Sequence, residues 1–184
     1  MTGKTTTANT PDRNTEPIRS ALSAGDGIDF TIIELLFFAY RDFTSDPDQI
    51  LAQYGFGRAH HRVVHFVNRR PGLTVAELLD VLKITKQSLA RVLKQLLDTG
   101  HIVQVQGAHD RRQRELYPTA RGRALAVALA APQARRIAAA LADTEARDRA
   151  AVERFLMGMV DPELREQIAP ASQSAGQSAG QPAG

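Results

Sequence analysis

The sequence contains no cysteine. Disulfide bonds, thiolate zinc sites and cysteine-based peroxide sensing are therefore excluded for this chain. It also lacks any run approaching the ~18 consecutive apolar residues that a membrane-spanning helix needs. The first segment, Met1 to Asn14, is polar and has no apolar core, which is unlike a secretory signal. From these absences we expect a cytoplasmic protein.

Motifs of the common enzyme classes are missing as well. The sequence has no Gly-rich phosphate loop, no Gly-x-Ser-x-Gly and no His-Glu-x-x-His. His109 and Asp110 stand next to each other, but no nucleophile accompanies them at a fixed spacing. We therefore expect neither catalysis nor a cofactor.

Charge is distributed unevenly along the 184 residues, whose net charge is only +3. Between Phe56 and Arg123 there are 13 Lys and Arg residues against 5 Asp and Glu, and all 5 histidines also lie there. Neutralising phosphates supplies much of the affinity for nucleic acids, so this basic segment is typical of a polyanion-binding unit. A solvated basic face would give the same counts, and charge alone does not decide between the two.

The spacing of apolar residues predicts a mainly α-helical chain with a small β-hairpin. Residues 30–43 are apolar nearly all round, so this helix should be buried on more than one side, as in a dimer core. Asp46 is expected to cap a separate short helix that starts at Pro47. Pro132 is expected to kink or split the long helix that Thr119 caps. Further helices are predicted at Arg58–Arg69, Val75–Leu82, Lys86–Asp98 and 144–160.

Two of these helices are short and separated by a tight turn. Thr74 and Glu77 form a capping box that opens the first of them. Ala76 is expected to allow close approach of a partner helix, on one face with Leu79 and Leu82. Ile84, in the turn, is expected to reach the core. Two extended segments, 101–105 and 115–117, then form a hairpin around a polar loop. The order is typical of a winged helix-turn-helix over about residues 74–117.

The second short helix presents a polar face that the core does not require. Gln pairs bidentately with adenine and Arg with guanine, and a helix N-terminus favours phosphate. Lys94, one turn beyond Arg91, is expected to meet the DNA backbone. An ordinary helical hairpin with a solvated face is the alternative. The candidate base- and phosphate-contacting residues of this helix are Thr85, Lys86, Gln87, Ser88, Arg91 and Lys94.

The stretch from Ala108 to Gly122 resembles the wing signature of the MarR family of winged-helix regulators. Asp110, Arg112, Thr119 and Gly122 stand at the family's positions, with Pro118 where the family usually has Leu. Upstream, residues 73–78 together with Ser88, Arg91, Leu96 and Gly100 also fit. The resemblance covers about residues 30–160, and residues 82–91 look closest to the PetP/LdtR-like branch.

The resemblance implies a homodimer that binds palindromic operators. Dimerisation helices would occupy residues 28–55 and 119–168. The composition of residues 1–27 and 169–184, which offer almost nothing to bury, separately predicts that both are disordered tails. The winged helix-turn-helix region would span residues 56–118. Arg112 would enter the minor groove, oriented by Asp110, with Arg111 and Arg114 beside it on the wing. Two-fold symmetry predicts half-site centres about one DNA turn, ~34–36 Å, apart.

Members of this family often bind small aromatic or phenolic effectors between the dimer layer and the DNA-binding lobe. Here that crevice would be lined by Phe37, Tyr40, Phe56, Arg58, His61 and His65. The aromatic residues could equally be dimer core. His61 and His65, spaced i, i+4, could share a metal ion, but there is no cysteine, and we expect no metal site.

A winged helix can also serve protein–protein assembly or RNA binding, or bind nucleic acid without sequence preference. These alternatives predict that substitutions on the recognition face leave sequence-specific DNA affinity intact.

Overall fold

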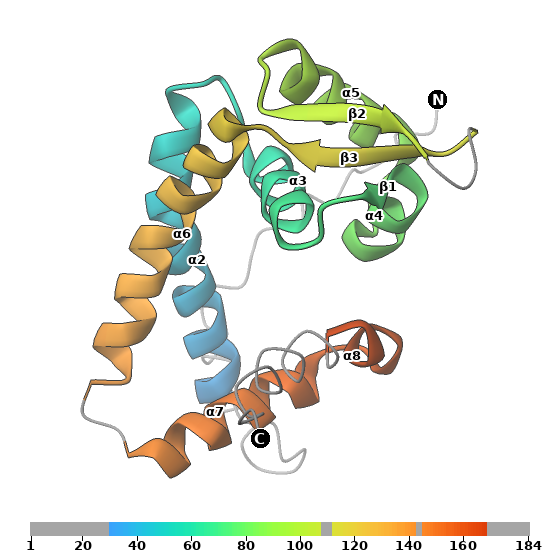
Figure 1. The fold of residues 1–184 in the computed structure, drawn as a ribbon. Coiled ribbons are helices and arrows are strands. Elements are labelled where there is room, and N and C mark those ends of the chain that lie inside the picture. The colour runs from blue at the N-terminus through green and yellow to red at the C-terminus, as the bar shows by residue number, and fades with distance from the viewer. Residues whose placement is uncertain (1–29, 108–111, 143–144, 169–184) are drawn as a thin grey trace, which may run out of the picture. The chain divides into compact units, whose positions relative to one another are not determined.

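The computed structural model describes residues 30–107, 112–142 and 145–168. The tails predicted to be disordered, 1–27 and 169–184, lie outside these residues. The chain divides into an N-terminal unit that ends at Asp42 and a larger unit that starts at Phe43. The elements, labelled in Figure 1, are α2 (Phe30–Ala52), α3 (Arg58–Arg69), β1 (Leu73–Thr74), α4 (Val75–Leu82), α5 (Lys86–Asp98), β2 (Ile102–Gln106), β3 (Arg114–Pro118), α6 (Ala120–Ala140), α7 (Ala146–Met159) and α8 (Pro162–Ile168).

The described part of the N-terminal unit is the first stretch of α2, residues 30–42. None of these residues is buried, although the stretch is rich in large apolar side chains. Phe37 is 69% exposed. A helix with this much open apolar surface needs a partner to cover it. The exposed large side chains are Ile32, Ile33, Leu35, Phe37, Phe38 and Tyr40.

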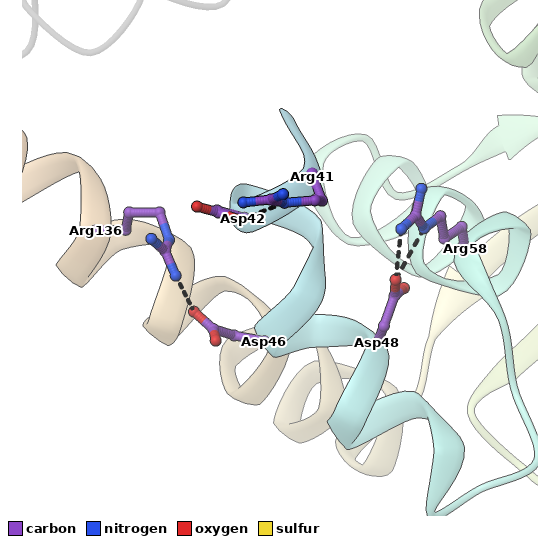
Figure 2. Close-up of polar contacts among 6 residues, drawn as sticks. All are labelled: Arg41, Asp42, Asp46, Asp48, Arg58 and Arg136. Carbon is purple, nitrogen blue, oxygen red and sulfur yellow. Dashed lines mark hydrogen bonds and ion pairs between the residues drawn. The ribbon is translucent and has the colours of Figure 1, made fainter. Parts of the chain in front are cut away.

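The expected break at Asp46 and Pro47 does not occur, because α2 runs through both residues. Proline lacks the N–H that would bond to the carbonyl four residues earlier, which is that of Phe43. The side-chain Nε2 of Gln133 donates to this carbonyl instead, at 3.2 Å. Asp46 forms an ion pair with Arg136 at 3.2 Å rather than capping a new helix (Figure 2). The expectation failed because α6 supplies both partners from 90 residues away.

The expected break at Pro132 is also absent, and α6 is continuous from Ala120 to Ala140. Alanine has the highest helix propensity, and Ala130 and Ala131 before Pro132 and Ala134 after it favour a helix in the neighbouring turns. The predicted positions of α3, α4 and α5 agree with the structure.

The core of the larger unit surrounds α3, which contacts α4, α5, α6 and β3. Val63, Val64 and Val67 are fully buried on one face of α3. Burying side chains of this size contributes about 1.5–3 kcal/mol each. The other buried apolar residues are Leu51, Phe56, Leu73, Leu78, Leu82, Leu89, Val92, Leu93, Leu96, Ile102, Leu116, Leu125 and Leu129.

The strands form a three-stranded antiparallel sheet in the order β1-β3-β2 (Figure 1). The hairpin of β2 and β3 was expected, and its register pairs Ile102 with Pro118 and Gln106 with Arg114. The two-residue strand β1 was not expected. It pairs Leu73 with Leu116 and so places the hairpin next to the start of α4.

The first turn of α6 packs directly against the backbone that leads into β2. Thr119 caps α6 by accepting from the N–H of Gly122, and its hydroxyl donates to the carbonyl of Gly100 at 2.7 Å. The backbone N–H of Thr119 donates to the carbonyl of His101 at 3.1 Å. A Cβ on Gly122 would overlap that same carbonyl oxygen. Only glycine therefore lets the first turn of α6 lie against the start of β2.

The C-terminal part of the chain contains α7 and the short α8. The sequence predicted α7, whereas α8 was not expected as a separate helix. Apolar side chains repeat along one face of α7 and are exposed, as on the first part of α2. They are Val152, Phe155, Leu156 and Met159. Among the described helices, none has the length and hydropathy to cross a membrane.

Candidate nucleic-acid interface

The first helix of the helix-turn-helix starts with the predicted capping box. The N–H of Glu77 donates to Thr74 Oγ1 at 3.3 Å, and the Glu77 carboxylate accepts from the backbone N–H of Thr74 at 2.8 Å. The Thr74 hydroxyl also donates to this carboxylate, at 2.6 Å. This bond, together with the one from the backbone N–H of Thr74, lowers the pKa of Glu77. The helix buries Leu78 and Leu82, one turn apart, whereas Ala76 is exposed. The expected close approach at Ala76 is therefore wrong, because the buried face of α4 begins two residues later.

The turn between α4 and α5 has two local determinants. Lys83 adopts the left-handed conformation, with φ 49°, and ends α4. Ile84 is partly buried and packs against the core, as the sequence predicted. A third determinant was not predicted: the guanidinium of Arg62 in α3 donates to the carbonyl of Leu82 at 2.7 Å. No local pattern around Arg62 signals this contact, since the partners are 20 residues apart.

Helix α5 separates into a buried and an exposed face. Leu89, Val92, Leu93 and Leu96 are buried. The six residues predicted to contact DNA from this helix and its cap are all exposed: Thr85, Lys86, Gln87, Ser88, Arg91 and Lys94. The exposed polar face of α5 therefore contributes nothing to the buried core.

Three of these six residues already have side-chain partners. Thr85 caps α5 by accepting from the N–H of Ser88 at 3.2 Å, and its hydroxyl donates to Ser88 Oγ at 2.9 Å. Lys94 forms an exposed ion pair with Asp98 at 2.5 Å, one turn further along. Such a pair contributes little to stability, so Lys94 can exchange it for a phosphate.

Lys86, Gln87 and Arg91 differ from those three. Their side chains make no hydrogen bond or ion pair with any residue of the described chain. An amide and two cations on the first two turns of a helix suit base edges and phosphates in a major groove.

The wing is formed by β2 and β3. Arg112, before β3, and Arg114, at its start, are exposed. Asp110 and Arg111, the other predicted wing residues, lie outside the described residues. Tyr117 donates to the carboxylate of Glu115 at 2.8 Å, which raises the pKa of the phenol. Pro118 ends β3 opposite Ile102.

The six residues predicted to bind an effector fall in different places. Phe37 and Tyr40 belong to the N-terminal unit, and the others to the larger one. Phe56 is buried and stacks on His60, so it is part of the core. The Arg58 guanidinium is paired with the Asp48 carboxylate at 2.8 Å (Figure 2).

His61 and His65 lie on α3, half-buried and exposed respectively. Burial lowers the pKa of both, aided by the charge of His65 on His61 and of Arg69 on His65; the Asp48 carboxylate opposes this at His61. Both rings are therefore neutral at pH 7. Within the described residues, no three His, Asp or Glu side chains are grouped so that they could hold a metal ion.

An open groove of about 920 Å³ lies between the second half of α2 and α6. Ile50, Ala128 and Pro132 form apolar parts of its wall. The ion pair between Asp46 and Arg136 and the side chain of Arg135 are its charged parts. The groove is distinct from the exposed face of α5.

Comparison with known proteins agrees with this architecture. A sequence model described as "MarR family" matches residues 54–113. Over 133 residues the chain is 47% identical to the HTH-type transcriptional regulator PetP of Rhodobacter capsulatus, covering 72% of this chain and 80% of that protein. This relative belongs to the branch that the sequence resembles.

Solved structures share the fold at low sequence identity. The crystal structure of Streptococcus pneumoniae FabT in complex with DNA matches with a TM-score of 0.61 at 18% identity, over 71% of this chain and 94% of that one. The crystal structure of MarR matches with a TM-score of 0.58 at 20% identity, over 78% of this chain and 95% of that one. The likeness extends over most of each chain.

Proposed function

Since the chain belongs to the MarR family of transcriptional regulators, we propose that it binds double-stranded DNA sequence-specifically, as a homodimer on palindromic operators. The observation that carries this proposal is the exposed face of α5. Lys86, Gln87 and Arg91 have no side-chain partner in the described chain, while the opposite face is buried. In our proposal α5 enters the major groove, and Arg112 on the wing enters the adjacent minor groove. A regulator that acts in this way works in the cytoplasm, on the chromosome.

The dimer is supported by apolar surface that the single chain leaves open. Residues 30–42 of α2 and one face of α7 both expose large apolar side chains, of which Phe37 is 69% and Leu156 51% exposed. A two-fold dimer formed through these helices would cover both surfaces and pair two copies of α5. The operator should then be an inverted repeat with half-sites about one DNA turn apart.

The DNA-binding proposal is tested by selecting bound sequences from a random duplex pool at about 0.15 M salt. We expect an inverted repeat with one-turn half-site spacing. Arg91→Ala should change the preferred base at one position of each half-site, whereas the matched control Arg135→Ala, on α6, should keep the wild-type motif. Recovery of no motif, with binding that vanishes as salt rises, would indicate a nonspecific polyanion binder instead.

The dimer is tested by light scattering over a concentration series. Phe155→Glu places a charge on the apolar face of α7 and should convert the dimer to monomer. Arg154→Gln, on the opposite face of the same helix, should leave the dimer intact. A wild-type protein that is monomeric at micromolar concentration contradicts the proposal.

We further propose that a small aromatic acid weakens DNA binding. Arg58 is the residue that supports this, because its guanidinium already holds a carboxylate, that of Asp48. A ligand carboxylate could replace Asp48 there, near the neutral rings of His61 and His65. The test is a titration of benzoate- and salicylate-like compounds into a DNA-binding assay. An unchanged affinity at millimolar concentration would rule these compounds out as effectors.

A further inference from the structure

Two histidines lie inside the core, where α2, α3, α5, β2 and α6 meet. We call Tyr54, Phe56, His60 and His101 the histidine cluster. His60 stacks on Phe56 with ring centroids 4.6 Å apart, and His101 meets the same ring edge-on at 5.3 Å. Tyr54 packs against His101 at 5.6 Å. His60 is 8% and His101 0% exposed, so protons reach both rings only if the cluster opens.

The contacts of His60 define which ring nitrogen carries the hydrogen. The backbone N–H of Gly57 donates to Nδ1 at 3.1 Å, and a backbone N–H can only donate. Nδ1 is therefore unprotonated, and Nε2 donates to the side-chain oxygen of Gln95 at 2.6 Å. The neutral ring satisfies both partners. A second proton on Nδ1 would face the N–H of Gly57 and break that bond.

The contacts of His101 define its neutral form in the same way. The Thr99 hydroxyl donates its hydrogen to the carbonyl of Gln95 at 2.7 Å. Its oxygen therefore accepts from Nδ1 of His101 at 2.8 Å. This leaves Nε2 unprotonated and buried, with no hydrogen-bond partner among the described residues. A proton on Nε2 would put an unpaired charge in the core, which is costly.

Charged groups near the cluster do not favour protonation. Burial lowers the pKa of His101, and the positive charge of Arg121 on α6 lowers it further. The titratable group in contact with the ring is Tyr54, from the turn after α2, while His60 of α3 contacts Phe56, which also touches His101. The residues that α5 directs at the cluster, Gln95 and Thr99, carry no charge.

Both histidines hold the same end of the same helix. His60 is bonded to Gln95, in the last turn of α5, and His101 to Thr99, which caps it. The exposed face of α5, with Lys86, Gln87 and Arg91, begins two to three turns earlier on this helix. Release of the C-terminal end of α5 would therefore change how the whole helix is presented.

We propose that His60 and His101 are positioning residues for DNA binding, and that His101 holds the end of α5 only while its ring is neutral, so that mild acid releases DNA. This inference rests on the DNA-binding function proposed above. The DNA-competent state binds fewer protons than the released state, so affinity falls as pH drops through the pKa of His101, which burial holds below the ordinary value for histidine. A single proton of this kind costs up to about tenfold in affinity per pH unit.

The direction in which acid changes DNA affinity distinguishes this effect from the simple gain of positive charge. Protonation of the less buried His61 and His65 adds positive charge, which strengthens binding to a polyanion. Acid should therefore tighten DNA binding if the buried histidines play no part, and weaken it if they hold α5.

The test is the affinity of the full chain for its selected duplex at pH 7.5, 6.5 and 5.5 and constant ionic strength. Wild type should bind more weakly at pH 5.5 than at pH 7.5, with a loss of up to about tenfold per pH unit once the pH is below the pKa of His101. His101→Phe keeps an aromatic ring in the histidine cluster but takes no proton. It also loses the hydrogen bond to Thr99, so it should bind less tightly than wild type at pH 7.5, but its affinity should change much less between pH 7.5 and 5.5. The matched control His65→Gln should lose as much as wild type. Tighter wild-type binding in acid, or an equal loss in His101→Phe, overturns the proposal.

A second measurement covers the case in which His101→Phe does not fold. NMR titration of the histidine rings in the wild-type protein should show His101 protonated on Nδ1 alone at pH 7.5. Its protonation midpoint should coincide with the midpoint of DNA loss, and midpoints more than one pH unit apart would contradict the proposal. If the protein binds no duplex at pH 7.5, the DNA-binding function fails. The histidine cluster can then be tested by thermal unfolding. The midpoint temperature of wild type should be lower in acid than at pH 7.5, and that of His101→Phe should fall by less.

Discussion

The guanidinium of Arg62 donates a hydrogen bond of 2.7 Å to the carbonyl oxygen of Leu82, the last residue of α4. The next residue, Lys83, is left-handed, so α4 ends at this point. A cation at the C-terminal carbonyls of a helix is favoured by the hydrogen bond and by the helix dipole. Arg62 therefore stabilises the point at which the chain turns from α4 towards α5.

Replacing Arg62 should affect both stability and DNA binding. We expect Arg62→Ala to lower the free energy of unfolding by about 1–2 kcal/mol, because the carbonyl of Leu82 loses a charged donor. Arg62→Lys should recover part of this loss. Urea unfolding and DNA titration measure the two effects, with Arg69→Ala on the last turn of α3 as control. Equal stability of Arg62→Ala and wild type would show that the bond contributes nothing.

Gln133 and Pro47 should be energetically coupled. Gln133→Ala leaves the carbonyl of Phe43 without its donor and should cost about 1 kcal/mol. In a Pro47→Ala background, the new backbone N–H can bond to the same carbonyl, and Gln133→Ala should then cost little. A double-mutant cycle by urea unfolding measures the coupling. Additive effects would mean that Gln133 does not compensate for the proline.

Arg91 and Lys94 should differ in what they contribute to DNA recognition. Arg91→Ala should cost about 1–3 kcal/mol and weaken discrimination at one base position, if Arg91 contacts a base. Lys94→Ala should weaken binding to all sequences alike. It should also reduce the slope of the logarithm of the binding constant against the logarithm of salt concentration by about one. Asp98→Ala frees Lys94 and should strengthen binding at low salt. The same loss from both, without a change of preferred sequence, would refute these roles.

The capping box should make α4 sensitive to strong acid. The pKa of Glu77 is lowered by its hydrogen bonds to Thr74, so its stabilisation is fully present above about pH 4.5 and is lost as pH falls through the lowered pKa. Thr74→Ala should cost about 1 kcal/mol at pH 7. Glu77→Gln keeps an acceptor and should flatten the acid limb of a stability–pH profile. A Glu77→Gln profile that overlays wild type would exclude this titration.

Two glycines in helices should respond oppositely to alanine. At Gly122 the added Cβ would overlap the carbonyl of His101, so Gly122→Ala should destabilise the protein and shift β2 away from α6. At Gly158, in α7, a Cβ meets nothing within 4 Å, and Gly158→Ala should stabilise the helix by up to about 1 kcal/mol. Thermal unfolding of both variants tests this difference. A Gly122→Ala protein as stable as wild type would show that α6 and β2 can move apart to accommodate the added Cβ.

The sequence predicted the parts of the fold that depend on local patterns. The capping box at Thr74, the end of α5 near Gly100 and the hairpin follow from residues a few positions apart, and the structure confirms them. The prediction at Pro47 was wrong because its compensation comes from Gln133, 90 residues away. Strand β1 was missed for the same reason, since two residues become a strand only through pairing with Leu116 and Glu115.

In the candidate site, too, features set by local sequence patterns could be predicted and features set by distant contacts could not. The exposed positions of α5 follow from helical periodicity, so Lys86, Gln87 and Arg91 could be selected in advance. The buried state of His101 could not, because it depends on the close approach that Gly122 permits and on rings contributed by Tyr54 and Phe56. Histidine before a strand is usually exposed, so the sequence around His101 does not indicate that its ring is buried among aromatic side chains.

Thr74 belongs to two elements at once: it is paired with Glu115 of the wing in β1, and it caps α4. A displacement of the hairpin is therefore transmitted through one residue to the helix-turn-helix. If α5 and the wing bind adjacent grooves as proposed, their contacts with the two grooves are mechanically coupled through Thr74 rather than independent. Mismatches under the wing and under α5 should consequently not add their penalties, and an operator that is wrong in one groove should alter the preference in the other.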